Sequence, residues 1–140
     1  MPRKILVVVE KHLLTPLGLR SLAPSDPNYR SIYRGNVESR DSAYHQGTVW
    51  PWLMGPFVTA YLKVHRHSSE AIANVRRWLH AFEEHLQTAG LGHISEIADG
   101  NPLHSPRGCI AQAWSVGELL RAIPEDVLRI APGPGLRIAL

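Results

Sequence analysis

The sequence lacks most of the features that mark secreted, membrane-spanning or nucleic-acid-binding proteins. Cys109 is the single cysteine, which excludes an internal disulfide and fits a reducing cytoplasm. No segment approaches the roughly 20 apolar residues of a membrane-spanning helix, and the charged pair Glu10 and Lys11 directly follows the short apolar run Ile5–Val9. The net charge is only +3 and the arginines are scattered. We therefore expect a cytoplasmic protein with no membrane or nucleic-acid partner.

Helical periodicity dominates the rest of the sequence. Apolar residues recur every three or four positions in four segments, Arg3–Leu14, Thr48–His65, Glu70–Thr88 and Cys109–Ile123. The β-branched run Val7–Val9 would suit a buried strand equally well, and we predict a helix there. The sequence thus predicts an all-α domain of about four helices over residues 1–123, followed by a poorly ordered tail over residues 124–140.

The segment His93–Gly108 interrupts this helical pattern. Its glycines and prolines predict a structured loop between two helices. Glu96 lies there between Ile94 and Ile97, and no lysine or arginine is nearer in sequence than Arg107. A carboxyl group in apolar surroundings suits a general base or acid, because desolvation disfavours its charged form. The alternative is an ordinary exposed loop carboxylate.

Polar and aromatic residues that could surround Glu96 form the inventory of a sugar site. They are Arg40, Asp41, Tyr44, His45, Gln46, Trp50 and Trp52 before it, and Asp99, His104 and Arg107 after it. Aromatic rings stack on pyranose faces, while carboxylates, amides and guanidinium groups bind hydroxyls. The tryptophans could equally be core residues, and an Asp–Arg pair could be a structural tie. The histidine spacing fits no zinc template, and His12, His80 and His85 fall on expected helix surfaces.

Three stretches carry the pattern of a known family, in the same order along the chain. They are LLTPLGLRSLAPSDPNYR (Leu13–Arg30), RDSAYHQGTVWPWLMGPF (Arg40–Phe57) and GLGHISEIADGNPLHSPRGCIAQAWSVGELLRA (Gly90–Ala122). They closely resemble the C-terminal part of the amylo-α-1,6-glucosidase domain of glycogen debranching enzymes, which is related to the glucoamylase-like six-hairpin glycosidases. The resemblance implies the C-terminal portion of an (α/α)6 toroid whose loops form a glucose pocket.

The resemblance also implies an activity and its residues. It implies inverting hydrolysis of α-1,6-linked glucose at the branch stubs of glycogen or a limit dextrin, without a metal or cofactor. The catalytic base of the Ser-Glu-Ile motif falls on Glu96. The substrate-binding residues that it implies are Tyr44, His45, Gln46, Trp50, Trp52 and Arg107.

One catalytic group is missing from this assignment. An inverting glycosidase needs two carboxyl groups about 6.5–9.5 Å apart, and the family's acid is an aspartate in an upstream motif outside this sequence. Asp41 and Asp99 are weak substitutes, because the resemblance places them at structural or binding positions. We therefore expect a fragment that is inactive alone and is completed by a partner polypeptide or by self-association. The alternatives are a carbohydrate-binding or scaffolding fragment without turnover and a small helical protein unrelated to sugars.

Overall fold

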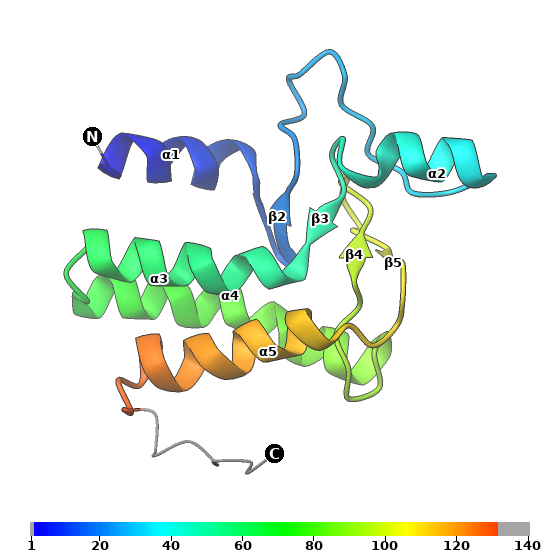
Figure 1. Ribbon diagram of the computed structural model, residues 1–140. Coiled ribbons are helices and arrows are strands. Elements are labelled where there is room, and N and C mark those ends of the chain that lie inside the picture. Colours follow the sequence, from blue (N-terminus) through cyan, green and yellow to red (C-terminus); the bar gives the residue numbers. More distant parts are fainter. Residues whose placement is uncertain (1, 132–140) are drawn as a thin grey trace, which may run out of the picture.

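The structure, a computed structural model, describes residues 2–131 and contains five α-helices and five short β-strands in that range (Figure 1). The helices are α1 (Pro2–His12), α2 (Val37–Tyr44), α3 (Met54–Val64), α4 (Ser69–Thr88) and α5 (Ala113–Ala122). The strands are β1 (Leu14–Thr15), β2 (Gly18–Arg20), β3 (Val49–Trp50), β4 (Ile97–Ala98) and β5 (Pro106–Arg107). The prediction of an all-α fold, as the C-terminal portion of an (α/α)6 toroid, is therefore wrong.

The strands form one antiparallel sheet in the order β1-β2-β3-β4-β5. Each has only two or three residues, which is too short to show the alternating pattern by which strands are recognised in a sequence. The prediction therefore gave these residues to loops and helix ends. The sheet pairs segments that are distant in the chain, such as Leu19 with Trp50 and Val49 with Ala98.

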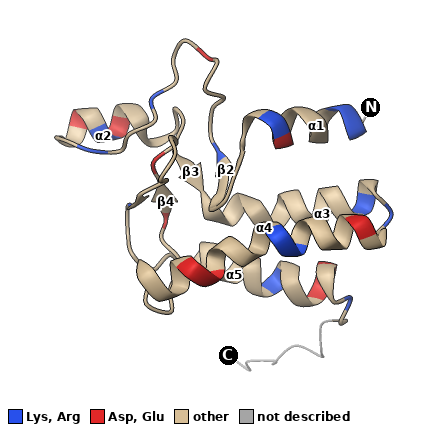
Figure 2. Cartoon of the chain, turned by 180° about the vertical axis from the view of Figure 1, so that it is seen from behind, with Lys and Arg blue, Asp and Glu red and all other residues tan. Residues whose placement is uncertain are grey.

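The sheet divides the molecule into two halves (Figure 1). The helical half contains α1, α3, α4 and α5, which lie side by side, while α2 and the long loop before it lie on the other side of the strands. We call this second part, together with the sheet, the strand half. Charged residues of both signs are interspersed over the elements of both halves (Figure 2).

Helix α3 is the centre of the hydrophobic core, because it packs against α1, α4 and α5. Its Met54, Val58 and Leu62 are fully buried and belong to one cluster with buried residues of the other three helices. Gly55 permits the close approach of α5, since a Cβ there would collide with the Glu118 carboxylate.

The predicted helices agree with the structure to different degrees. Helix α4 begins as predicted, and the hydroxyl oxygen of Ser68 accepts a hydrogen bond from the Ala71 N–H. The helix expected from Thr48 begins only at Met54, after β3 and a 3₁₀ turn at Pro51–Leu53. Helix α2 was not predicted, because Ala43 is its single buried residue and it therefore has no apolar stripe.

Beyond α5, a π-helical turn at Ile123–Val127 continues the helix. Val127 is buried in the core, and Asp126 accepts hydrogen bonds from Thr59 and Arg121. The predicted tail of residues 124–140 falls partly outside the described residues, from 132 onward, and the domain boundary at residue 123 stays a prediction. None of the helices within residues 2–131 is long and apolar enough to cross a membrane.

Candidate active site around Glu96

Glu96 lies on an irregular hairpin whose central pair is β4 and β5. Outside these strands the two arms stay paired: the Glu96 N–H donates to the Cys109 carbonyl at 2.9 Å, and the Gln112 N–H donates to the Ile94 carbonyl at 2.9 Å. We call residues 94–112 the Glu96 hairpin. The predicted structured loop is thus a hairpin that holds the backbone of Glu96 by direct hydrogen bonds.

The carboxylate of Glu96 is half-buried and accepts a hydrogen bond at each oxygen. The Tyr44 hydroxyl donates to Oε1, and the Cys109 N–H donates to Oε2 at 3.1 Å. Burial, and then the hydrogen bond to Glu96, raise the pKa of the Tyr44 hydroxyl above its ordinary value of 10.0, so it remains a donor at neutral pH. Two donors therefore fix the orientation of this side chain.

Gly108 is required beside the carboxylate. Its φ is +68°, in the left-handed region, and a Cβ at this position would collide with Glu96 Oε2. The absence of a side chain lets the backbone of the second hairpin arm approach the carboxylate closely enough for the Cys109 N–H to reach it.

An aromatic cluster surrounds the Tyr44 ring. Its ring centroid lies 4.6 Å from that of His45, 4.9 Å from Trp50 and 5.5 Å from Tyr33. His45 stacks on Trp50 with an interplanar angle of 6°. Trp50 itself is only 6% exposed, and its Nε1–H donates to the buried Thr48 hydroxyl at 3.0 Å. Trp50 therefore supports the cluster from within, whereas the exposed His45 covers it.

The sequence left open whether an Asp–Arg pair here is a structural tie, and Asp99 and Arg107 do form such a pair. Arg107 Nε and Nη2 both donate to Asp99 Oδ2, at 3.0 and 2.8 Å, and the Tyr33 N–H donates to Oδ1 at 2.9 Å. This hydrogen bonding raises the pKa of Arg107. Because Asp99 is buried and accepts at both oxygens, it joins the hairpin to the loop before α2.

The other residues predicted to bind substrate make their contacts away from Glu96. The Gln46 side chain is exposed, and the backbone carbonyl of this residue accepts from the Arg30 N–H at 2.6 Å. Trp52 contacts the half-exposed Trp114 of α5, with 6.5 Å between ring centroids. Tyr44, His45 and Trp50 are thus brought together with Glu96, while Trp52 belongs to a different aromatic pair. The substrate-binding roles of all six residues stay predictions.

The sequence reading missed two supporting residues and misplaced one. Thr48 is fully buried, and its hydroxyl links the Trp50 indole to the Tyr44 carbonyl. Tyr33 packs on Tyr44. His85 was assigned to a helix surface, yet it is buried; its position three residues after Phe82 on the apolar stripe of α4 was the available signal.

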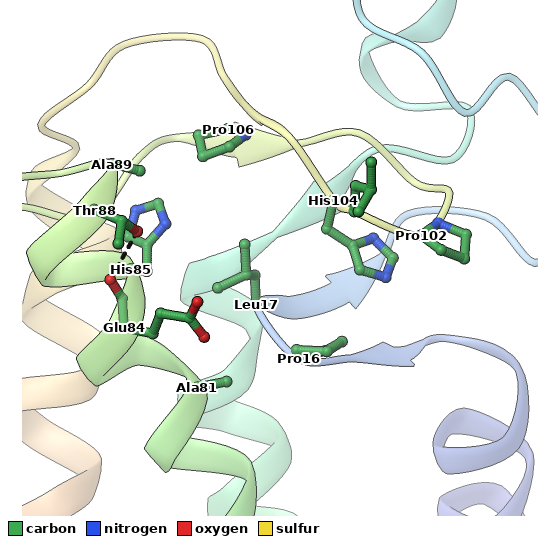
Figure 3. Close-up of a pocket in the computed structure, with 11 residues that line it drawn as sticks. Pro16, Leu17, Ala81, Glu84, His85, Thr88, Ala89, Pro102, His104 and Pro106 are labelled. Carbon is green, nitrogen blue, oxygen red and sulfur yellow. Dashed lines mark hydrogen bonds between the residues drawn. The ribbon is translucent and has the colours of Figure 1, made fainter.

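A cavity of about 450 Å³ lies outside this cluster (Figure 3). It is formed by the β1–β2 turn, the C-terminal part of α4 and the tip of the Glu96 hairpin. Its lining residues include Leu17, Glu84, His85, Pro102 and His104, but not Glu96 or Tyr44. Within residues 2–131, no group of three or more His, Cys, Asp or Glu side chains could hold a metal ion.

Comparison with known proteins relates the chain to one family. The amylo-alpha-1,6-glucosidase family matches residues 2–121. The glycogen debranching enzyme of Saccharomyces cerevisiae is 36% identical over 80 residues. That alignment covers 53% of this chain and only 5% of the yeast protein, so the chain spans a small part of the length of this relative.

Proposed function

Because the chain belongs to the amylo-alpha-1,6-glucosidase family, we propose that it contributes the catalytic base to a site that hydrolyses α-1,6-linked glucose in an α-glucan. The observation that carries this proposal is the Glu96 carboxylate, which is half-buried and oriented by Tyr44 and the Cys109 N–H. A fixed carboxylate beside an aromatic cluster is the arrangement that a glycosidase base needs.

In the proposed reaction Glu96 acts on water. It removes a proton from a water molecule as the water oxygen bonds to the anomeric carbon, while the bond from that carbon to the departing glycosidic oxygen breaks. A second carboxyl group protonates the departing oxygen, so atoms and charges balance. Because water attacks the face opposite the leaving group, the released glucose has the β configuration.

We assign the acid to a partner polypeptide rather than to Asp99. A carboxylate that accepts from Arg107 twice and from the Tyr33 N–H has no proton to donate. Asp41 is exposed on α2, and the variant Asp41→Asn tests it directly. If the chain alone released glucose from a limit dextrin and Asp41→Asn abolished that release while the protein stayed folded, the acid would lie within this chain.

α-D-Glucosyl fluoride separates the base from the acid. Fluoride is a good leaving group that needs little protonation, so a site with a base and no acid should still convert this compound to β-glucose and fluoride. We expect fluoride release by the chain alone, with the β anomer formed first by NMR, and negligible glucose release from a limit dextrin.

Glu96→Gln should lower the rate of fluoride release roughly 10²–10⁴-fold, because the amide keeps the shape and cannot accept the proton. Glu83→Gln is the matched control, since that side chain is 68% exposed on α4. Unchanged fluoride release by Glu96→Gln would remove Glu96 from the mechanism.

One observation favours a second function, carbohydrate binding without turnover. Both oxygens of Glu96 already accept hydrogen bonds from the protein, as expected of a residue that orders its own loop. In that case isomaltose would shift the NMR signals of Tyr44 and His45, while fluoride would not be released.

A further inference from the structure

His85 on α4 makes a contact that the proposed reaction does not explain. Its side chain is buried, 5% exposed, and its Nε2 lies 3.2 Å from the backbone nitrogen of Ser95, the residue directly before Glu96. A backbone N–H can only donate, so Nε2 must be the acceptor. The imidazole is therefore neutral, with its proton on Nδ1.

This bond connects the Glu96 hairpin to the helical half. The peptide groups on either side of Ser95 are paired across the hairpin, through the Ile94 carbonyl to Gln112 and the Glu96 N–H to Cys109. The Ser95 N–H instead meets the His85 ring. Ser95 is itself buried, so an N–H without this acceptor would be left unpaired away from water, which is unfavourable.

We infer that His85 is a positioning residue for Glu96. As a neutral acceptor, its ring holds the first arm of the Glu96 hairpin on α4 and so sets where the Glu96 carboxylate meets Tyr44. This inference rests on the proposed role of Glu96 as the base. His85 itself touches neither water nor sugar in this scheme.

The geometry makes the position of Glu96 sensitive to acid. Protonated Nε2 is a donor, and it would then oppose the Ser95 N–H, which is also a donor. Burial lowers the pKa of His85 from its ordinary value of 6.5. Among the residues that line the same cavity, Glu84 and His104 are the other titratable groups (Figure 3).

The sign of the pH effect follows from the lowered pKa. Between the folded pKa of His85 and about 6.5, the unfolded chain binds more protons than the folded chain. The contribution of His85 is therefore complete above about pH 6.5 and decreases as the pH falls toward the folded pKa. The hairpin should loosen first at Ser95, because that N–H loses its acceptor.

The test compares two substitutions of His85 that differ in whether the new side chain can accept a hydrogen bond. His85→Gln keeps an acceptor near the position of Nε2, whereas His85→Leu keeps a similar volume without one. His80→Gln and His80→Leu are the matched controls, because His80 is on the same helix and its side chain is 77% exposed. Hydrogen exchange at the Ser95 amide, the carboxyl ¹³C shift of Glu96 and fluoride release from α-D-glucosyl fluoride are measured for each.

We expect His85→Leu to raise the hydrogen-exchange rate of the Ser95 amide and to lower fluoride release about tenfold. His85→Gln should keep most of the Ser95 protection and most of the fluoride release. Wild-type Ser95 protection should also be lost as the His85 ring signal titrates, which needs no variant. Unchanged Ser95 protection or an unchanged Glu96 shift in His85→Leu would overturn the inference. If the wild-type chain released no fluoride, the proposed function would fail separately, and the Ser95 and Glu96 signals would still decide the role of His85.

Discussion

The helical half and the strand half of this protein are stabilised in different ways. In the helical half, α3 packs its fully buried Met54, Val58 and Leu62 against three neighbouring helices. In the strand half, the side chains around Glu96 are held mainly by hydrogen bonds, by the Asp99–Arg107 pair and by ring contacts. The helical half therefore depends mainly on apolar burial, whereas the immediate surroundings of Glu96 depend on directional contacts.

The difference teaches where the chemistry can be placed. A packed helical core tolerates few polar groups but supplies rigidity. A hairpin tied by individual hydrogen bonds can present a half-buried carboxylate at a set angle, which a base requires. The two halves meet where the chain runs from β3 into α3 and at the His85–Ser95 hydrogen bond.

The largest effect on stability should come from the helical half. Leu62→Ala removes a fully buried side chain of α3 and should lower the free energy of unfolding by about 2–5 kcal/mol, measured by urea denaturation. Leu103→Ala makes the same chemical change at the tip of the Glu96 hairpin, where the leucine is 95% exposed. That variant should change the free energy by less than about 0.5 kcal/mol.

If Leu62→Ala and Leu103→Ala lowered the free energy of unfolding equally, the distinction between the two halves would not hold. Such a result would mean that Leu103 is covered in solution, by self-association or by a partner chain. Light scattering on Leu103→Ala and on the wild type separates these two causes, because self-association would change the measured mass.

A smaller effect, opposite in sign between the two halves, is expected at glycines. Gly108→Ala forces a side chain into the left-handed region against Glu96 and should destabilise the protein by about 1–2 kcal/mol. Gly117→Ala in α5 meets no atom within 4 Å of its new Cβ and should stabilise it by about 0.5–1 kcal/mol. Thermal unfolding of both variants checks the signs, and destabilisation by both would show that α5 is covered at Gly117.

Sequence reasoning was correct where a periodic pattern existed. Helices α1, α3 and α4 carry apolar residues at regular spacing, and the prediction located each, although α3 begins six residues after the predicted start at Thr48. Helix α2 has no such stripe, and its Asn36 cap alone was too weak a signal. The five strands were missed because each has only two or three residues, too few to show an alternating pattern. In addition, β3 pairs with β2 and β4, which are far from it along the chain, and long-range pairing leaves no local pattern.

The candidate site was predictable in its residue types but not in its contacts. The carboxylate and the aromatic residues near Tyr44 were found from composition and resemblance. That Trp50 is buried under His45, and that Arg107 is paired with Asp99, depends on the sheet register. The importance of His85 depends on a backbone N–H ten residues away, which no side-chain pattern reveals.

A pair of tyrosine variants gives the comparison that is most specific for the site. Tyr44→Phe removes the hydroxyl that donates to Glu96, and Tyr61→Phe removes one that accepts from Asn74 Nδ2 at 2.9 Å in the helical half. Each loses one hydrogen bond, so both should lower the free energy of unfolding by about 0.5–1.5 kcal/mol. Only Tyr44→Phe should also slow fluoride release from α-D-glucosyl fluoride, because only it frees the Glu96 carboxylate to rotate. If Tyr61→Phe slowed the reaction equally, orientation of Glu96 would depend on the whole fold rather than on the contacts of the strand half.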